Sequence, residues 1–401
     1  MTTEAICILI TIVVYLGMVL AIGFHFARKN ESSSDFYLGG RKLGPLVTAM
    51  SAEASDMSSY LLMGLPGLAY LSGAAEVGWT VIGLTLGTYL NWLFTARRLR
   101  RYTHETGSFT LPQFLSNRYR DEKHILTMIA ALIIIIFFIP YTASGFAACG
   151  KLFSSLFGIN YMAAMIVSAI VIVGYTAAGG FLAASTTDFI QSIVMTIAIV
   201  FVLGFSTFTA GGIDAVIENA RTLPGYLSFT NTYIEENGAS APYTFLQIIT
   251  TVSWGLGYFG MPHILLRFMA IEDECKLKTS RRVASVWVVI AMAIAVMIGI
   301  VGRTLSAKGF VEQLSGSATE TIIVRIADML SSYGIFPALM AGLILSGILA
   351  STMSTADSQL LAASSSVSQN ILQETLHLNL SNKASMFAAR LTVIVIAVLG
   401  V

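Results

Sequence analysis

Long uncharged runs recur along the chain at the length that a helix needs to cross a bilayer, about 20 mostly apolar residues. Ten such stretches are predicted as membrane helices: 5–27, 43–71, 77–96, 125–150, 161–178, 189–209, 244–271, 283–302, 335–361 with a helical extension to 372, and 384 onward. A short amphipathic helix is expected at 320–330. The pattern predicts an all-α, polytopic membrane protein that lies in a lipid bilayer.

The composition supports this class and excludes several others. Hydrophobic residues make up 55% of the chain and charged residues 11%, against roughly 25% charged in an average soluble domain. The net charge of +1 offers no basic footprint for a nucleic acid. The three cysteines form no CxxC pair, and no GxSxG or P-loop motif occurs. We therefore expect neither an enzyme nor an organic cofactor or transition metal.

The distribution of basic residues predicts the orientation. The first run lies between Glu4 and the pair Arg28 and Lys29, which is the reverse of a secretory signal peptide. With the N-terminus outside, only five of the 23 basic residues fall in outer loops: Lys151, Arg221, Arg303, Lys308 and Arg325. This asymmetry follows the positive-inside rule, so an outside N-terminus is predicted.

Two of the predicted helices are interrupted. The stretch 51–70 carries Glu53 and Asp56 in an apolar setting, which by itself suggests a functional site. Gly64–Gly67 follows, and Gly and Pro in the same segment suggest an interrupted helix with free backbone carbonyls. The seventh stretch has its own Gly and Pro interruption, five helices later and in the opposite direction. Such a pair predicts an inverted-repeat transporter. The second repeat would need an eleventh helix, so we expect that the chain is truncated within its tenth helix.

The ninth stretch carries a dense cluster of oxygen atoms. Ser351, Ser354, Thr355 and Ser358 fall within about 100° of helical arc, with Asp357 at the edge of that face. Hydroxyls, a carboxylate and carbonyls of a broken helix suit a monovalent cation. The alternative interpretation is tight helix packing through small hydroxyl side chains.

Other polar and aromatic residues keep two interpretations each. Asp188 opens the sixth stretch as an N-cap or binds an ion. Glu53 and Asp56 share a face and would repel each other if both were ionised. Arg267 pairs with an acid or extends to the membrane surface. Trp254 and Tyr258, at i and i+4 on one face, form a pocket wall or pack in the core. The surrounding GxGxxG is no nucleotide motif, because no strand precedes it.

Several segments resemble the sodium:solute symporter family, and in particular its proline-transporting branch. They are YLGGRKLGP (37–45), SAEASDMSSYLLMGLPG (51–67), IPYTASG (139–145), GGFLAASTTDFIQ (179–191), WGLGYFGMPHILLRFMA (254–270) and STMSTADSQLL (351–361). The resemblance implies a LeuT-type five-plus-five inverted repeat in one transmembrane domain over 1–401. It also implies sodium-coupled import of L-proline by alternating access, in the plasma membrane of a prokaryotic cell.

The resemblance also assigns roles to individual residues. The implied sodium ligands are the carbonyls of Ala54, Met57 and Ser351 and the hydroxyls of Ser354 and Thr355. The carbonyls of Ala54 and Met57 are implied to be freed by a break near Asp56. Residues implied to support the sodium site or its path are Asp56, Ser58, Asp188, Asp357 and Ser358. A second sodium ion is implied near Asp188, Ser354, Asp357 and Ser358. The implied proline-binding residues are Tyr141, Trp254, Tyr258 and Pro262.

Three residues depart from the family pattern. Glu53 stands where a small residue is common, Ser59 where glycine is usual, and Met261 where glutamine often precedes the proline. The first two bear on ion affinity and the third on the solute. Alternatives are therefore import of another amino acid, a betaine or a carboxylate, or a sensor or channel on the same fold.

Overall fold

The computed structural model describes residues 2–28 and 32–401, so Lys29 of the first predicted loop lies outside the described residues. Within them, six helices are long and apolar enough to cross a membrane: Thr3–Ala27, Ile125–Phe157, Tyr161–Thr209, Glu274–Ala307, Ile335–Thr375 and Asn382–Gly400. The prediction of an all-α membrane protein is confirmed. The predicted stretches 161–178 and 189–209 together form one bent helix among these six, whereas 43–71 and 244–271 each fold as two shorter helices.

The elements follow the predicted order. They are α1 (Thr3–Ala27), α2 (Ser33–Leu38), α3 (Pro45–Met57), α4 (Leu65–Ser72), α5 (Ala74–Phe94), α6 (Ala96–Glu105), α7 (Leu111–Tyr119), α8 (Ile125–Phe157), α9 (Tyr161–Thr209), α10 (Ile213–Thr222), β1 (Asn231–Ile234), β2 (Ala239–Pro242), α11 (Phe245–Ser253), α12 (Pro262–Ala270), α13 (Leu277–Ala307), α14 (Ile322–Ser331), α15 (Ile335–Ser365) and α16 (Asn382–Gly400). A π-helix over Ser366–Thr375 extends α15, as the sequence predicts.

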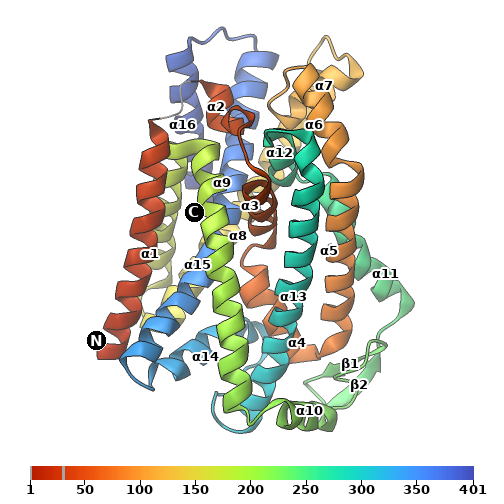
Figure 1. Cartoon of the computed structure of the whole chain (residues 1–401), viewed down its shortest axis with the longest axis vertical. Coiled ribbons are helices and arrows are strands. Elements are labelled where there is room, and N and C mark those ends of the chain that lie inside the picture. The colour runs from red at the N-terminus through yellow and green to blue at the C-terminus, as the bar shows by residue number, and fades with distance from the viewer. Residues whose placement is uncertain (1, 29–31) are drawn as a thin grey trace.

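Helix α15 crosses the middle of the bundle, with α1, α8 and α9 packed against it (Figure 1). Every side chain from residue 344 to residue 366 is buried. A helix at a lipid or solvent boundary leaves one face uncovered, so this part of α15 is enclosed by protein. Its many Ser, Thr and Ala residues allow close approach of the neighbouring helices. The predicted oxygen cluster therefore lies in the protein interior.

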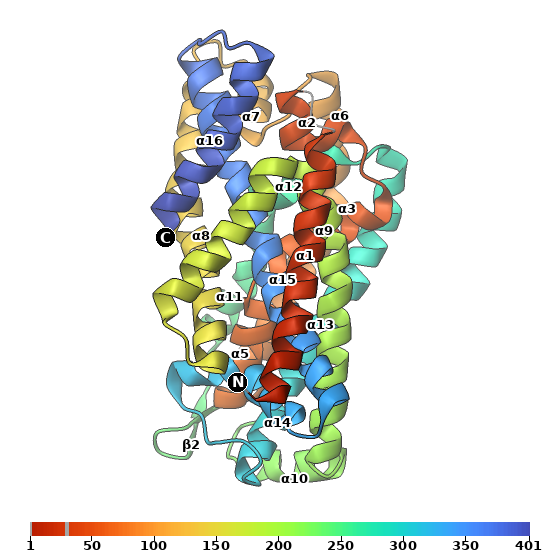
Figure 2. The ribbon, with the colours of Figure 1, turned by 90° about the vertical axis from the view of Figure 1, so that its left-hand side faces the viewer.

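A turn at Gly179–Gly180, between the fifth and sixth predicted helices, divides α9 into two arms that run in opposite directions (Figure 2). Gly180 has φ 63° and ψ −156°, and a Cβ there would lie 2.7 Å from the Phe36 side chain. Only glycine adopts this backbone without strain. The sixth predicted helix therefore begins directly after Gly180, not at Phe189. The interpretation of Asp188 as an N-cap is wrong, because the helix is continuous around it.

The second predicted helix breaks at Ser58. Helix α3 ends at Met57, and Ser58 has φ 49° and ψ −169°, which residues other than glycine rarely adopt. A short π-helix over Tyr60–Gly64 leads into α4. Pro66 lies in the first turn of α4, where its missing N–H costs no hydrogen bond. The break near Asp56 is thus confirmed, and Gly64–Gly67 does not itself interrupt the chain.

The seventh predicted helix is also broken, as the glycines indicate. Helix α11 ends at Ser253, a 3₁₀ segment covers Trp254–Phe259, and α12 begins at Pro262. Gly255 faces α5 so closely that a Cβ on it would lie 2.0 Å from the Gly83 carbonyl oxygen. Glycine is required here because the backbones of the two segments approach closely. The glycine thus has a packing role, which agrees with the rejection of a nucleotide-binding motif.

The two ends of the bundle differ in character. Helices α10 and α14 and the hairpin of β1 and β2 lie at the end that holds the N-terminus (Figures 1 and 2). Helices α2, α6 and α7 lie at the other end. There the Arg41 guanidinium donates to the carbonyls of Met269, Thr103 and Ser108 at 2.7 to 2.8 Å. Burial lowers the pKa of Arg41 to about 10. These bonds join the end of α12 to α6 and to the segment after α6. This end of the bundle, which also carries the arginines of α6, is called the basic end below.

Candidate functional site

The end of α3 meets α15 at a set of buried oxygen atoms. Ala54 and Met57 belong to the last turn of α3, where backbone carbonyls lack intrahelical donors. Ser354 Oγ donates to the Ala54 carbonyl at 2.7 Å. The hydroxyls of Ser354 and Thr355 each lie 3.3 Å from the Ser351 carbonyl. Direct contacts thus join four of the five predicted sodium-binding residues, and all five are buried. Carbonyl and hydroxyl oxygens of this kind fit an alkali cation.

The break beside this cluster is held open locally. Ser58 Oγ accepts a hydrogen bond from the Tyr60 backbone N–H at 3.2 Å. Such a local bond gives the backbone an alternative to the helical ladder. Ser58 also lines a cavity beside this break, together with Ser59 and Tyr60. This cavity is called the main cavity below. One short segment therefore has sodium-type carbonyls on its N-terminal side and cavity-lining residues on its C-terminal side.

Asp188 forms a buried ion pair that resolves the interpretation of Arg267. Arg267 Nη2 lies 2.9 Å from Asp188 Oδ2, and the side chains are 1% and 0% exposed. Arg267 also donates through Nε to Ser51 Oγ at 3.0 Å and through Nη1 to the His263 carbonyl at 2.7 Å. Its guanidinium lies over the Phe181 ring. Arg267 is therefore a paired structural cation and does not extend to the membrane surface.

Asp357 lies beside that ion pair and has its own donors. The Tyr175 hydroxyl donates to Asp357 Oδ2 at 2.8 Å, and Ser358 Oγ donates to Asp357 Oδ1 at 2.9 Å. Arg267 Nη2 also donates to Ser358 Oγ. The guanidinium thus supplies positive charge in the region where the resemblance implies a second sodium ion. The polar contacts here favour a link between α9, α12 and α15.

Glu53 and Asp56 point away from α15, toward α5 and the broken seventh helix. Trp92 Nε1 donates to Glu53 Oε1 at 3.0 Å, and the Trp92 ring packs on Phe268 with centroids 4.4 Å apart. Both acids line a small enclosed cavity together with Asn91 and Tyr258. The predicted shared face of Glu53 and Asp56 is confirmed, and the indole N–H is one reason that a glutamate is accommodated there.

The main cavity, so called for its place beside the break after α3, has a volume of about 610 Å³, and another cavity of about 670 Å³ lies against α6 and α7. Tyr141 and Trp254, two of the implied proline-binding residues, both line the main cavity. Tyr60 is an additional lining residue that the sequence analysis missed, and its ring meets Trp254 edge-on at 5.1 Å. Its position two residues after Ser58 is the signal that would have indicated it. Lys151 at the cavity wall is ion-paired with Glu320 at 2.6 Å.

The other two implied proline-binding residues, Tyr258 and Pro262, do not belong to the lining of the main cavity. The prediction that Trp254 and Tyr258 share one face is wrong, because a 3₁₀ segment places residues i and i+3 in line instead. Trp254 is 51% exposed in the main cavity, whereas Tyr258 is buried beside Asp56. Pro262 is buried in the first turn of α12 and fixes where that helix begins. Of the residues that depart from the family pattern, Ser59 and Met261 line the main cavity.

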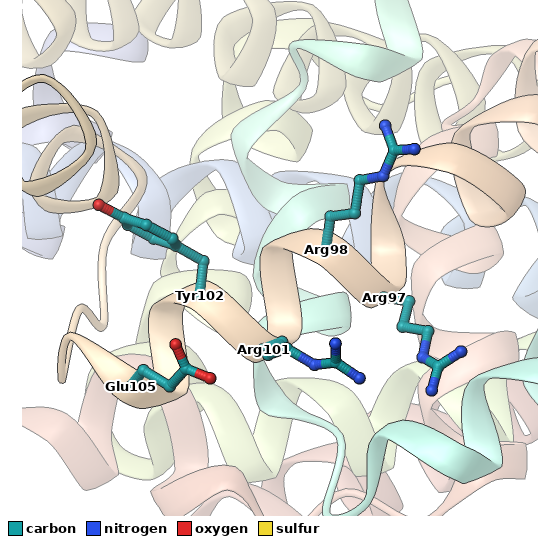
Figure 3. A pocket seen from close by; sticks show the side chains of 5 residues that line it. All are labelled: Arg97, Arg98, Arg101, Tyr102 and Glu105. Carbon is teal, nitrogen blue, oxygen red and sulfur yellow. The ribbon is translucent and has the colours of Figure 1, made fainter.

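A separate surface pocket of about 350 Å³ lies at the basic end of the bundle (Figure 3). Arg97, Arg98, Arg101, Tyr102 and Glu105 of α6 line it. Arg101 Nη2 lies 2.7 Å from Glu274 Oε1, an exposed pair of the kind that contributes little stability. None of the predicted site residues lines this pocket. Its arginines belong to the charge pattern from which the orientation is predicted.

The break after α3, the second break after α11 and the enclosed helix α15 define a helical transporter of the LeuT type. Solved structures agree with this fold. A sodium-coupled sialic acid symporter has 18% identity and a TM-score of 0.81, covering 98% of this chain and 80% of its own. The phenylalanine-bound MhsT structure has 14% identity and a TM-score of 0.59, covering 90% and 79%.

The chain belongs to the sodium:solute symporter family, which it matches over residues 36–401. It is 38% identical to the sodium/proline symporter of Escherichia coli, over 98% of this chain and 76% of that protein. It is 40% identical to the sodium/proline symporter of Haemophilus influenzae, over 98% and 76%. The high-affinity proline transporter PutP of Bacillus subtilis is 38% identical, over 95% and 77%.

Proposed function

We propose that this protein is a sodium-driven symporter that imports L-proline across the plasma membrane of a prokaryotic cell. Residues 1–401 would act as one transmembrane transporter domain with the N-terminus outside. Support comes from the proline-transporting relatives and from one observation above all. The Ala54 carbonyl, at the last turn before the break in α3, is contacted by Ser354 of α15.

In this proposal sodium binds between α3 and α15. Its ligands are the carbonyls of Ala54, Met57 and Ser351 and the hydroxyls of Ser354 and Thr355. The ion replaces the Ser354 hydrogen bond as the partner of the Ala54 carbonyl and holds the two helices together. The hydroxyl oxygens remain available to the ion, because a hydroxyl can accept as well as donate.

The break at Ser58 connects the ion to the solute. Ordering of the carbonyls before Ser58 also orders Ser59 and Tyr60 after it, and these residues line the main cavity. Sodium therefore raises the affinity for proline, and proline must raise the affinity for sodium by the same factor. Tyr60, Tyr141 and Trp254 offer aromatic surface to the apolar ring of proline.

The solute would enter from the end of the bundle that holds the N-terminus. Lys151 and Glu320 line the cavity there, and Glu320 belongs to the 3₁₀ segment Gly316–Thr321 that leads into α14. At the opposite end Arg41 holds the chain closed through three backbone carbonyls. Release to the other side would then require these contacts to separate, as alternating access demands.

Sodium-jump uptake of labelled proline in proteoliposomes tests the function. Uptake should need an inward sodium gradient and should accumulate proline against its own gradient. Thr355→Ala should raise the sodium concentration for half-maximal uptake. Thr352→Ala is the matched control, because among the described residues Thr352 Oγ1 bonds only to the Ile348 carbonyl in its own helix. Proline uptake that is insensitive to sodium would refute the proposal.

A second candidate is symport of another small solute on the same site. It is favoured by Ser59 and Met261, which line the main cavity and depart from the pattern of the proline branch. A competition panel of amino acids, betaines and carboxylates against labelled proline decides between the two. Proline is the solute if none of the panel competes more strongly than unlabelled proline.

A further inference from the structure

A second cluster of oxygen atoms lies on the other side of α3. Glu53, Asp56, Thr88, Asn91 and Tyr258 line an enclosed cavity of about 10 Å³ between α3, α5 and the 3₁₀ segment. This volume suits one water-sized species. The remaining lining residues are Ala52, Trp92 and Ile264, so no basic side chain faces the two carboxyl groups in the cavity.

Two of these buried oxygens have no hydrogen-bond partner among the described residues. They are Asp56 Oδ2 and Asn91 Oδ1. Asp56 is 9% exposed and Asn91 is 1% exposed. Buried polar atoms are nearly always satisfied, so a pair of orphaned acceptors at one cavity indicates a bound species that contacts both. That species must carry a positive charge or hydrogen-bond donors, because both unsatisfied atoms are hydrogen-bond acceptors.

The orientation of the Asn91 amide follows from its other contact. Asn91 Nδ2 donates to the Tyr258 carbonyl oxygen at 2.8 Å. A carbonyl can only accept, so the amide nitrogen must lie on that side and Oδ1 on the other. Glu53 is similarly oriented, because Trp92 Nε1 holds its Oε1 at 3.0 Å. Tyr258 lines the same cavity as Asp56.

This cluster is separate from the sodium ligands proposed above. Residues three apart share a helix face, so Glu53 and Asp56 both point toward α5. The Ala54 carbonyl is contacted from α15 instead. Ser55 Oγ likewise contacts Ser358 of α15 at 3.1 Å. The two oxygen clusters therefore lie on different sides of α3 and have no residue in common.

We propose that Glu53, Asp56 and Asn91 form a second site for a monovalent cation, sodium, in this transporter. The site rests on the proposed function, since the coupling gradient supplies the ion. Two carboxylates and an amide oxygen provide hard oxygen ligands without nitrogen or sulfur. The ion neutralises the repulsion between the two acids. It also joins α3 to Tyr258 of the broken seventh helix, so that both interrupted helices are ordered by sodium.

Equilibrium binding of ²²Na⁺ to the purified protein, together with the charge moved per proline in proteoliposomes, tests the second site. Glu53→Gln retains the size of the side chain and an acceptor for Trp92, but removes the charge. Wild type should show a Hill coefficient for sodium above one, and Glu53→Gln should show about one, because the coefficient cannot exceed the number of coupled sites. Asn91→Ala should weaken sodium binding without any change of charge.

The control is Glu122→Gln, the same substitution at an exposed position, which should leave both measurements at wild-type values. The second site is overturned if wild type binds one sodium ion and moves one charge per proline. It is also overturned if Glu53→Gln binds as many sodium ions as wild type. Proline uptake with no sodium dependence would overturn the proposed function and the second site with it. Sodium-dependent uptake with one charge per proline overturns the second site alone.

Discussion

The buried ion pair between Arg267 and Asp188 gives the most sharply defined prediction. Arg267→Gln leaves the Asp188 carboxylate without its cation, and Asp188→Asn leaves the guanidinium without its anion. Both side chains are almost fully buried, at 1% and 0% exposure. Loss of one partner of a buried pair costs about 3–5 kcal/mol. Each single substitution should therefore lower the free energy of unfolding by about that amount.

The double substitution, Arg267→Gln with Asp188→Asn, should be far less harmful than the sum of the single ones. It leaves no uncompensated charge, and the two introduced amide side chains would retain some of the hydrogen bonds to Ser51 and the His263 carbonyl. We expect a coupling energy toward the upper end of the range of about 0.5–3 kcal/mol that contacting residues show. Much of the measured cost of either single change would then be the cost of a stranded charge.

The measurement is a double-mutant cycle on reversible unfolding in mixed micelles, with folded fraction followed by circular dichroism. Arg267→Lys is the informative control, because it keeps the charge but loses the planar fork that reaches four partners. Its cost should lie between those of wild type and Arg267→Gln. The reasoning is refuted if the two single costs add within about 0.5 kcal/mol, the limit expected for independent sites.

Three further substitutions test other parts of the structure. Ser354→Ala strips the Ala54 carbonyl of its donor, so stability should fall by about 1–3 kcal/mol, with a higher sodium requirement in uptake titrations. Trp254→Ala removes the edge contact with Tyr60, worth about 0.5–1.5 kcal/mol; the KM for proline should rise severalfold, and an unchanged KM would exclude Trp254 from the solute site. Gly180→Ala forces alanine into a left-handed turn against Phe36, so the melting temperature should drop, whereas Gly204→Ala in the same helix, with open space around it, should not lower it.

Much of the fold was predictable because the membrane requires each crossing segment to satisfy its own backbone. Apolar runs of fixed length therefore mark helices directly. The interrupted second and seventh helices were predictable for a related reason, since Gly, Pro and acids are costly in an apolar segment unless they serve a site. The exact point of the first break was not, because Ser58 adopts a strained backbone that its sequence neighbours do not reveal.

The candidate site was predictable only in part. Helical periodicity placed Ser351, Ser354 and Thr355 on one face, and α15 is regular enough for that inference to hold. The same periodicity failed for Trp254 and Tyr258, because close packing of Gly255 on α5 accompanies a 3₁₀ segment in place of an α-helix. Periodicity is reliable only where the helix type is known beforehand.

The sequence by itself determined that this is a helical membrane protein with two broken helices, an oxygen-rich ninth helix and a family resemblance. These features are local, since each depends on residues within a few turns of one another. The tertiary structure alone decided which partner each buried polar group has: Arg267 for Asp188, Trp92 for Glu53, and the Ala54 carbonyl for Ser354. Those contacts join residues distant along the chain, and packing of separate helices, which no local pattern encodes, brings them together.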